Sequence, residues 1–275
     1  MNGPPCILTI AGSDSGGGAG IQADLKTMTV LGAYGLSVVT ALTAQNTREV
    51  AAIDAPPPGF VARQLQVVLD DFAVAACKTG MLFSREIIEA LAPLLETRGF
   101  PLVVDPVCMS QTGHQLLLDD AVEALVSRII PLADLITPNK PEAELLAGMS
   151  ISGEGDIGRC LERLLDLGPA AVLLKGGHFQ GQEMVDWLAL PGQDPVRLSH
   201  RRIPTSHTHG TGCTLSAAIA THLGLGLPLE EAVRRSQDYL VLALQTGYPL
   251  GRGEGPPNHL APLQRLRGIA GEAGY

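Results

Sequence analysis

The sequence predicts a single α/β domain in three layers, αβα, with a mostly parallel central sheet and helices on both of its faces. Short apolar runs, which are typical of strands buried on both faces, alternate with longer amphipathic segments along most of the chain. A content of 45% hydrophobic and 17% charged residues is ample for a large buried core. The sequence has no internal repeat, long linker or compositional break. We therefore expect residues 1–275 to form one domain.

Six buried strands are expected, at residues 7–11, 37–42, 74–78, 102–105, 135–137 and 171–175. Helical patterns lie between and after them, at residues 19–31, 59–71, 84–97, 119–130, 140–146 and 156–167. Residues 184–190 and 196–204, separated by the turn 191–195, predict an antiparallel hairpin at the end of the sheet. Residues 212–224 and 229–247 predict two closing helices. The tail after Pro262 shows little apolar periodicity and is expected to fray.

The charge and cysteine content narrow the class of protein. A net charge of −9 argues against nucleic acid or an anionic membrane as the main partner. The five cysteines form no CxxC pair, which fits reduced thiols better than a disulfide framework or a zinc site. The sequence shows neither a secretory signal pattern nor an apolar run of about 18 residues. These observations predict a soluble, cytoplasmic protein.

Small and polar residues follow nearly every predicted strand. They occupy residues 12–20, 43–47, 79–82, 105–107, 137–142 and 175–178. In open α/β sheets, ligands bind beyond the carboxyl ends of the strands. Six such strand ends therefore predict one shared binding cavity.

The glycine-rich stretch 12–20 matches neither a dinucleotide-binding fingerprint nor a P-loop, because it lacks the GxGxxG spacing and because GxxxxGK[ST] occurs nowhere in the sequence. A run this flexible suits a loop that lies over a small planar ligand. Asp24 follows within the next helix. Its carboxylate either points back toward this loop or is solvated in the first turns of the helix.

Several residues at the later strand ends suit phosphate and Mg²⁺. Asp105 ends a buried run, where a carboxylate is costly unless it is paired or bound to a metal. Asn139 and Glu142 lie three residues apart on one helix face, where they either serve Mg²⁺ or cap the helix. Lys175 precedes two glycines and either neutralises phosphate or forms a salt bridge.

The turn from His209 to Thr214 is the strongest anion-binding candidate. Gly210, Thr211 and Gly212 lead into a helical segment, so unpaired first-turn N–H groups and the helix dipole should face an anion. Cys213 brings a reactive thiol to the same turn. His207 and His209 are expected to hold the approach to it rather than to bind a metal. Together with Lys175 and the Mg²⁺ candidates, this turn indicates phosphoryl transfer to a small molecule without a P-loop.

The sequence resembles the hydroxymethylpyrimidine/phosphomethylpyrimidine kinases of thiamine biosynthesis, which belong to the ribokinase superfamily. The motifs that carry the resemblance are residues 11–26, 40–47, 78–82, 137–139 with Glu142, 175–178, 208–216 and 253–259. They occur in the family's order and span a core of about residues 6–260. The resemblance implies a ribokinase-like fold and ATP-dependent phosphorylation of 4-amino-5-hydroxymethyl-2-methylpyrimidine, first to the monophosphate and then to the diphosphate.

The resemblance also implies roles for individual residues. Gln45 would read the pyrimidine edge, in a pocket formed with Gly12, Ala19, Asp24, Thr43, Met81 and Val107. Lys175, Asn139 and Thr211 would bind ATP, and Glu142 with Asp105 would serve Mg²⁺. Gly210, Thr211, Gly212 and Cys213 would form an anion hole, with Cys213 at the position where many relatives carry an aspartate base. A homodimer is expected from the family, and a monovalent cation is an additional candidate cofactor.

Two points leave alternatives open. In the loop after the fourth strand, Gln111 and His114 replace the family's usual lysine and acidic residue. These two residues leave a catalytically weak pyrimidine-binding protein as one alternative. The other is a pyridoxal or pyridoxine kinase of the same superfamily, because the thiol of Cys213 could add reversibly to an aldehyde substrate. The helix N-terminus should favour the thiolate of Cys213, whereas a nearby triphosphate opposes it. We expect Cys213 to accept the hydroxymethyl proton or to position that group.

Overall fold

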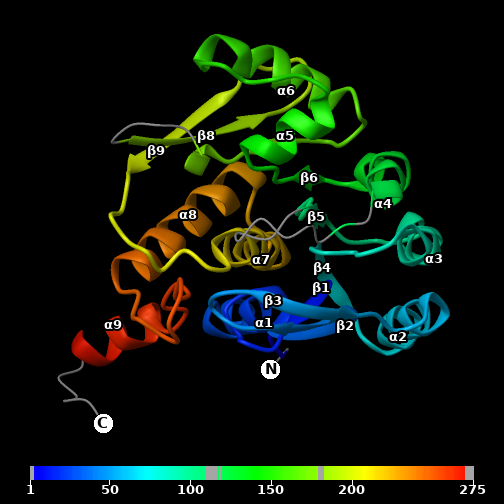
Figure 1. Ribbon diagram of the computed structural model, residues 1–275, viewed down its shortest axis with the longest axis horizontal. Helices are drawn as coiled ribbons and strands as arrows, with labels where there is room; N and C mark the ends of the chain where they lie inside the picture. The colour runs from blue at the N-terminus through cyan, green and yellow to red at the C-terminus, as the bar shows by residue number, and fades with distance from the viewer. Residues whose placement is uncertain (1–2, 109–116, 118, 179–182, 270–275) are drawn as a thin grey trace.

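The computed structural model describes residues 3–108, 117, 119–178 and 183–269, and these residues form nine strands in one continuous sheet (Figure 1). The strand order is β3-β2-β1-β4-β5-β6-β7-β8-β9. The strands are β1 (Cys6–Asp14), β2 (Tyr34–Gln45), β3 (Val50–Asp54), β4 (Val74–Thr79), β5 (Leu102–Val104), β6 (Leu135–Ile136), β7 (Val172–Leu174), β8 (Glu183–Ala189) and β9 (Val196–Arg201). The six strands from β2 to β7 in this order are parallel, so their carboxyl ends meet at one edge.

Helices cover both faces of the sheet, as predicted. The helices are α1 (Gly20–Val30), α2 (Pro58–Asp71), α3 (Arg85–Glu96), α4 (Asp119–Ala124), α5 (Lys140–Ala147), α6 (Ile157–Leu165), α7 (Thr211–Gly224), α8 (Leu229–Gln245) and α9 (Ala261–Ile269). One apolar layer packs α2 to α6 against the sheet, and a second layer packs α1, α7 and α8 against the opposite face (Figure 1).

The central strands alternate between these two layers. In β5, Leu102 and Val104 belong to the layer under α2 to α6, whereas Val103 belongs to the layer under α7, and all three are fully buried. Successive side chains of a strand point to opposite faces of the sheet, so a continuous apolar run fills both layers. The prediction that these short apolar runs are strands buried on both faces of the sheet is therefore confirmed.

Three elements differ from the sequence-based expectation. β3 is an additional strand that pairs antiparallel with β2, and its sequence was not recognised because most of its side chains are at least partly exposed. The expected helix at 119–130 is an α-helix only over Asp119–Ala124, and it continues as a π-helix at Leu125–Ile129 and a 3-10 turn at Ile130–Leu132, where Pro131 lacks an N–H donor. The described part of the C-terminal tail, up to Ile269, forms α9 rather than a frayed end, and this helix packs against α8.

No helix within the described residues is both long and apolar enough to cross a membrane.

Candidate active site

A cavity of about 420 Å³ lies at the carboxyl edge of the parallel strands, a volume typical of small-molecule sites. All but one of the predicted site residues line it. These are Gly12, Ala19, Thr43, Gln45, Met81, Asp105, Val107, Asn139, Glu142, Lys175, Gly210, Thr211, Gly212 and Cys213. The expectation that the strand ends share one cavity is therefore confirmed.

Asp24 is the predicted residue that does not line the cavity. It is fully buried on α1, where both carboxylate oxygens contact Nζ of Lys78 at 3.0 and 2.9 Å and one accepts a hydrogen bond from Thr9. It is therefore neither a solvated first-turn carboxylate nor placed for direct contact with a ligand in this cavity. Burial alone would lower the pKa of Lys78, but the neighbouring acidic groups, Asp24 foremost, together outweigh it and raise the pKa, so Lys78 stays charged.

Lys78, which the sequence analysis did not single out, lines the cavity at the end of β4. A buried lysine is rare without a carboxylate partner. Asp24 belongs to the sequence motif 11–26 and Lys78 to the motif 78–82, but only the fold shows that the two residues form an ion pair. Within this ion pair, the ammonium group of Lys78 belongs to a residue that lines the cavity, and its charge is balanced by Asp24 outside the cavity lining.

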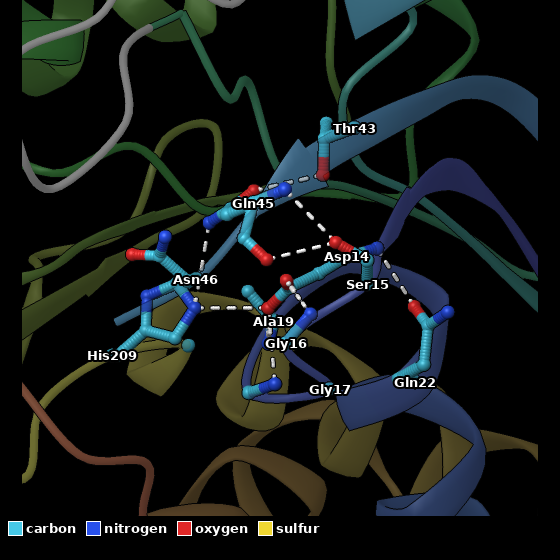
Figure 2. A network of polar contacts seen from close by, with 12 residues as sticks. Asp14, Ser15, Gly16, Gly17, Ala19, Gln22, Thr43, Gln45, Asn46 and His209 are labelled. Carbon is cyan, nitrogen blue, oxygen red and sulfur yellow. Dashed lines mark hydrogen bonds and ion pairs between the residues drawn. The ribbon is translucent and has the colours of Figure 1, made fainter. Parts of the chain in front are cut away.

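The glycine-rich loop after β1 is held in place by Asp14, a second residue not singled out from the sequence (Figure 2). Its carboxylate accepts hydrogen bonds from the backbone N–H groups of Gly16, Gly18 and Ala19 at 2.7, 3.0 and 2.8 Å. Nε2 of His209 lies 2.9 Å from the same carboxylate. Burial would raise the pKa of Asp14, but these hydrogen bonds outweigh it and hold the pKa below its usual value.

His209 therefore joins the glycine-rich loop to the turn before α7. This contact agrees with the expectation that His209 holds the approach to that turn. His207 instead packs against Gly247 and Gly255, so the two histidines face different neighbours. The described residues contain no group of three or more histidine, cysteine or acidic side chains that could hold a metal ion.

Gln45 lies at the end of β2, beside His209 (Figure 2). The side-chain oxygen of Gln45 is 3.1 Å from Oγ1 of Thr43, and the Thr43 hydroxyl also contacts the carbonyl oxygen of Ser13 at 3.0 Å. The backbone of Gln45 is fixed by two contacts with the Ser15 hydroxyl, at 2.8 and 2.9 Å. This end of the cavity therefore presents a side-chain amide, which can both donate and accept hydrogen bonds.

The N-terminus of α7 is packed closely against the glycine-rich loop. Gly210 is the N-cap with a φ of 86°, and a Cβ atom at this position would lie 1.9 Å from the carbonyl oxygen of Gly18. Only glycine allows both this left-handed conformation and this approach. The N–H groups of Gly212 and Cys213 lie in the first turn of α7, where a helix offers them no carbonyl partner. They are therefore available to an anion in the cavity.

Asp105 and Lys175 form an ion pair at the ends of β5 and β7, with Nζ of Lys175 2.8 Å from a carboxylate oxygen. Thr137 donates to the same carboxylate and Ser216 of α7 contacts it at 3.2 Å. Burial would raise the pKa of Asp105, but Lys175 and then Lys78 outweigh it and lower the pKa. The salt bridge considered for Lys175 is thus present, and Lys175 still lines the cavity.

Asn139 and Glu142 cap the N-terminus of α5. The side chain of Asn139 accepts from the N–H of Glu142 at 3.0 Å, and the carboxylate of Glu142 accepts from the N–H of Asn139 at 2.9 Å. The capping interpretation is therefore confirmed, although both side chains also line the cavity. Burial raises the pKa of Glu142 to about 7, with Lys175 opposing and Asp105 adding to the rise.

The thiol of Cys213 is not the thiolate that the helix N-terminus alone would favour. Burial raises its pKa to about 11, and the charge of Lys78 and a hydrogen bond from the Gly20 backbone only partly oppose this rise. The thiol is therefore protonated at neutral pH before any ligand binds.

Gln111 and His114, the two residues that depart from the family pattern in the loop after β5, lie outside the described residues.

The chain matches the phosphomethylpyrimidine kinase family over residues 14–258. It is 49% identical to a hydroxymethylpyrimidine/phosphomethylpyrimidine kinase of Rhizobium meliloti, over 92% of this chain and 96% of that protein. It is 52% identical to the thiamine biosynthesis bifunctional protein ThiED of Geobacter sulfurreducens, over 95% of this chain and 53% of that protein, so it spans about half of that relative's length.

Among solved structures, the chain is similar to an ADP complex of Bacillus subtilis pyridoxal kinase, with a TM-score of 0.87 and 34% identity over 96% of this chain and 99% of that one. This likeness fits the ribokinase-like fold that the resemblance implied. Because the family match covers most of its length, the chain belongs to the phosphomethylpyrimidine kinase family.

Proposed function

We propose that this protein is an ATP-dependent kinase that phosphorylates 4-amino-5-hydroxymethyl-2-methylpyrimidine to its monophosphate and then to the diphosphate, in thiamine biosynthesis. Its relatives at 46% to 52% identity carry the names of these kinases or of a thiamine biosynthesis protein. The identity to the pyridoxal kinase is lower, at 34%, which makes pyridoxal the less supported acceptor.

The observation that carries this proposal is the order of the strands beneath the cavity. Gln45 ends β2, Asp105 follows β5, and Asn139 and Lys175 follow β6 and β7. The sheet order therefore separates an acceptor end, near Gln45, from a nucleotide end, near Lys175. The N-terminus of α7 spans the two, since Gly210 contacts the loop after β1 and Gly212 lies beside Lys175 and Asp105.

At the acceptor end, the pyrimidine would lie among Gly12, Ala19, Met81 and Val107, with its polar edge on Gln45. Gly12 packs closely against Met81 in this pocket, because a Cβ atom there would lie 2.6 Å from the terminal methyl group of Met81. Asp24 would act from below through Lys78 rather than by touching the substrate. The hydroxymethyl group would then face Cys213.

At the nucleotide end, Lys175 and Asn139 would hold the phosphates of ATP, with Thr211 at the start of α7. The amides of Gly212 and Cys213 would stabilise the charge on the transferred phosphoryl group, which is the main source of catalysis in such reactions. The Cys213 thiol would position the acceptor hydroxyl by a hydrogen bond. It is a poor base in the free enzyme because burial raises its pKa to about 11.

The residues present fit a Mg²⁺ ion that arrives with ATP. Mg²⁺ keeps several waters and uses one or two carboxylates together with substrate phosphates, where it neutralises their charge. Glu142 fits this role well, because burial raises the pKa of its carboxylate to about 7 and the neighbouring Lys175 forms its ion pair with Asp105. Asp105 fits less well, because Lys175, Thr137 and Ser216 already contact its oxygens.

A parallel assay of three acceptors tests the proposal. The protein is incubated with ATP, Mg²⁺ and either the hydroxymethylpyrimidine, its monophosphate or pyridoxal, and products are resolved by ³¹P NMR. We expect product from both pyrimidines and a lower kcat/KM for pyridoxal. A preference for pyridoxal would support the pyridoxal kinase alternative. Binding of the pyrimidine without any product would contradict every kinase assignment.

The role of Cys213 is tested by Cys213→Ala and Cys213→Ser. A positioning role predicts a lower kcat for Cys213→Ala and partial recovery in Cys213→Ser, whose hydroxyl can also hydrogen-bond to the acceptor. Near-full turnover in Cys213→Ala, with intact pyrimidine binding, would contradict any role of the thiol in the transfer.

We further propose that residues 1–275 act as one kinase domain, as a homodimer in the cytoplasm, with a monovalent cation as an additional candidate cofactor. Sedimentation at assay concentration tests the dimer. Turnover in K⁺ compared with tetramethylammonium buffer tests the cation.

A further inference from the structure

The segment 251–259 near the C-terminus contains residues 253–259, one of the sequence motifs that carried the family resemblance, and the proposed function gives this segment no role. It runs past several parts of the active site. The hydroxyl of Thr47 accepts hydrogen bonds from the N–H groups of Arg252 and Gly253 at 3.2 and 3.0 Å. The carbonyl oxygen of Gly255 accepts from the N–H of His209 at 3.1 Å. The segment thus connects the end of β2 with the turn before α7.

The segment ends at His259, whose imidazole reaches the first turn of α7. His259 is 4% exposed, and its Nε2 lies 3.0 Å from Oγ1 of the fully buried Thr214. The Thr214 hydroxyl also lies 2.9 Å from the carbonyl oxygen of Gly210, the N-cap of α7. His259 is itself held by the Tyr239 hydroxyl, which donates to its backbone carbonyl at 3.2 Å.

The directions of these hydrogen bonds follow from counting hydrogens. The Thr214 hydroxyl has one hydrogen, and the Gly210 carbonyl oxygen can only accept. Both contacts of Oγ1 are hydrogen bonds only if Thr214 donates to Gly210 and Nε2–H of His259 donates to Thr214. Burial, together with the charge of Lys26, lowers the pKa of His259 to about 4, so the imidazole is neutral and carries this single hydrogen on Nε2.

The chain of hydrogen bonds ends on the peptide that determines where the anion-binding amides point. Gly210 has a left-handed φ of 86° and touches Gly18, so its carbonyl orientation fixes the start of α7 against the glycine-rich loop. The N–H groups of Gly212 and Cys213 follow within the next turn. A small rotation of the Gly210 peptide would move these donors away from the position of the transferred phosphate.

We propose that His259 is a positioning residue for phosphoryl transfer, which acts through Thr214 to hold the Gly210 carbonyl and so to aim the amides of Gly212 and Cys213. This role rests on the proposed kinase function. His259 does not line the cavity, so its side chain would not contact the substrate or the nucleotide. The expected signature is a lower kcat with little change in KM, since the donors act most strongly in the transition state.

The test compares four variants in the full-length protein. His259→Leu removes the donor, and His259→Gln replaces it with an amide N–H at a similar reach. Thr214→Val removes the intermediate hydroxyl. Tyr239→Phe is the matched control, because it removes a hydrogen bond to the same residue but leaves the imidazole link intact.

We expect His259→Leu to lower kcat by about tenfold to a hundredfold. This decrease does not exceed the one caused by removing a whole oxyanion-hole donor, about a hundredfold to a thousandfold. His259→Gln should recover most of that loss, and Tyr239→Phe should keep the kcat of the unmodified protein even where its Tm falls. Thr214→Val should match His259→Leu, and the double variant should show no further decrease, because both act on one path.

Amide hydrogen exchange of the peptide that covers residues 208–216 gives a readout independent of catalysis. Exchange should be faster in His259→Leu than in Tyr239→Phe. Equal exchange and equal kcat in these two variants would overturn the proposal, as would additive losses in the double variant. An unmodified protein that forms no product would instead contradict the proposed kinase function, and the exchange comparison would still test the link.

Discussion

Replacing Gly210 by alanine tests whether the close contact between the N-terminus of α7 and the glycine-rich loop builds the active site. Gly226 provides a matched control at the other end of the same helix. The two glycines have almost the same φ, 86° and 87°, but a Cβ atom on Gly226 would meet nothing within 4 Å. A Cβ atom on Gly210 would lie 1.9 Å from the carbonyl oxygen of Gly18.

The geometry gives separate magnitudes for the two substitutions. The left-handed conformation costs an L-residue about 1–2 kcal/mol, and both variants should lose this amount of unfolding free energy. Gly210→Ala must also separate the new methyl group from Gly18 by more than about 1 Å before the contact becomes tolerable. Overpacking of this kind typically costs a further 1–3 kcal/mol or so. A displacement of about 1 Å at reacting groups can lower the rate about a hundredfold.

Thermal unfolding and steady-state kinetics measure the two effects. Each kcal/mol should lower Tm by roughly 2–4 °C in a chain of this size. We expect Gly226→Ala to lower Tm only by the cost of its left-handed backbone conformation and to keep the kcat of the unmodified protein. Gly210→Ala should lower Tm further and reduce kcat about a hundredfold. Equal Tm and equal kcat in the two variants would show that the contact between Gly210 and Gly18 has no part in building the site.

Three further predictions concern the charged groups around the cavity. Lys78→Met should lower the unfolding free energy by about 3–5 kcal/mol in urea titrations, because it leaves Asp24 buried without its partner, and adding Asp24→Asn should restore most of it; an additive loss in the double variant would contradict this pairing. Because burial raises the pKa of Glu142 from 4.5 to about 7, the folded state binds a proton that the unfolded state has lost in this window, so stability should fall as pH rises from about 5 to about 7. The stability of Glu142→Gln, which can keep the capping box, should fall less over the same pH range. The same pH dependence in this variant and in the unmodified protein would refute the raised pKa of Glu142 as its cause. Lys175→Met should raise KM for ATP and lower kcat about a hundredfold, and unchanged nucleotide kinetics would exclude the phosphate role beside Asp105.

The sequence alone was sufficient for the parallel sheet and for most of the cavity. Strands buried on both faces are continuous apolar runs, so β1, β5 and β7 were visible as local patterns. The carboxyl ends of parallel strands meet at one edge, which is why residues as distant as Gln45 and Lys175 could be assigned to one site. β3 and α9 were missed because their stabilising contacts come from β2 and α8 rather than from their own periodicity.

Pairings between distant charged and polar groups were decided only by the tertiary structure. Asp24 and Lys78 are 54 residues apart, and Asp14 and His209 are 195 apart, so no local pattern indicates that either pair meets. The protonation of Cys213 depends on the same information. A helix N-terminus predicts a thiolate, but burial, which only the packed chain determines, raises the pKa to about 11. The sequence by itself thus determined most of the residues that line the cavity, whereas the tertiary structure decided their charge partners and protonation, because Coulomb and desolvation energies depend on distances in space and not on distances along the chain.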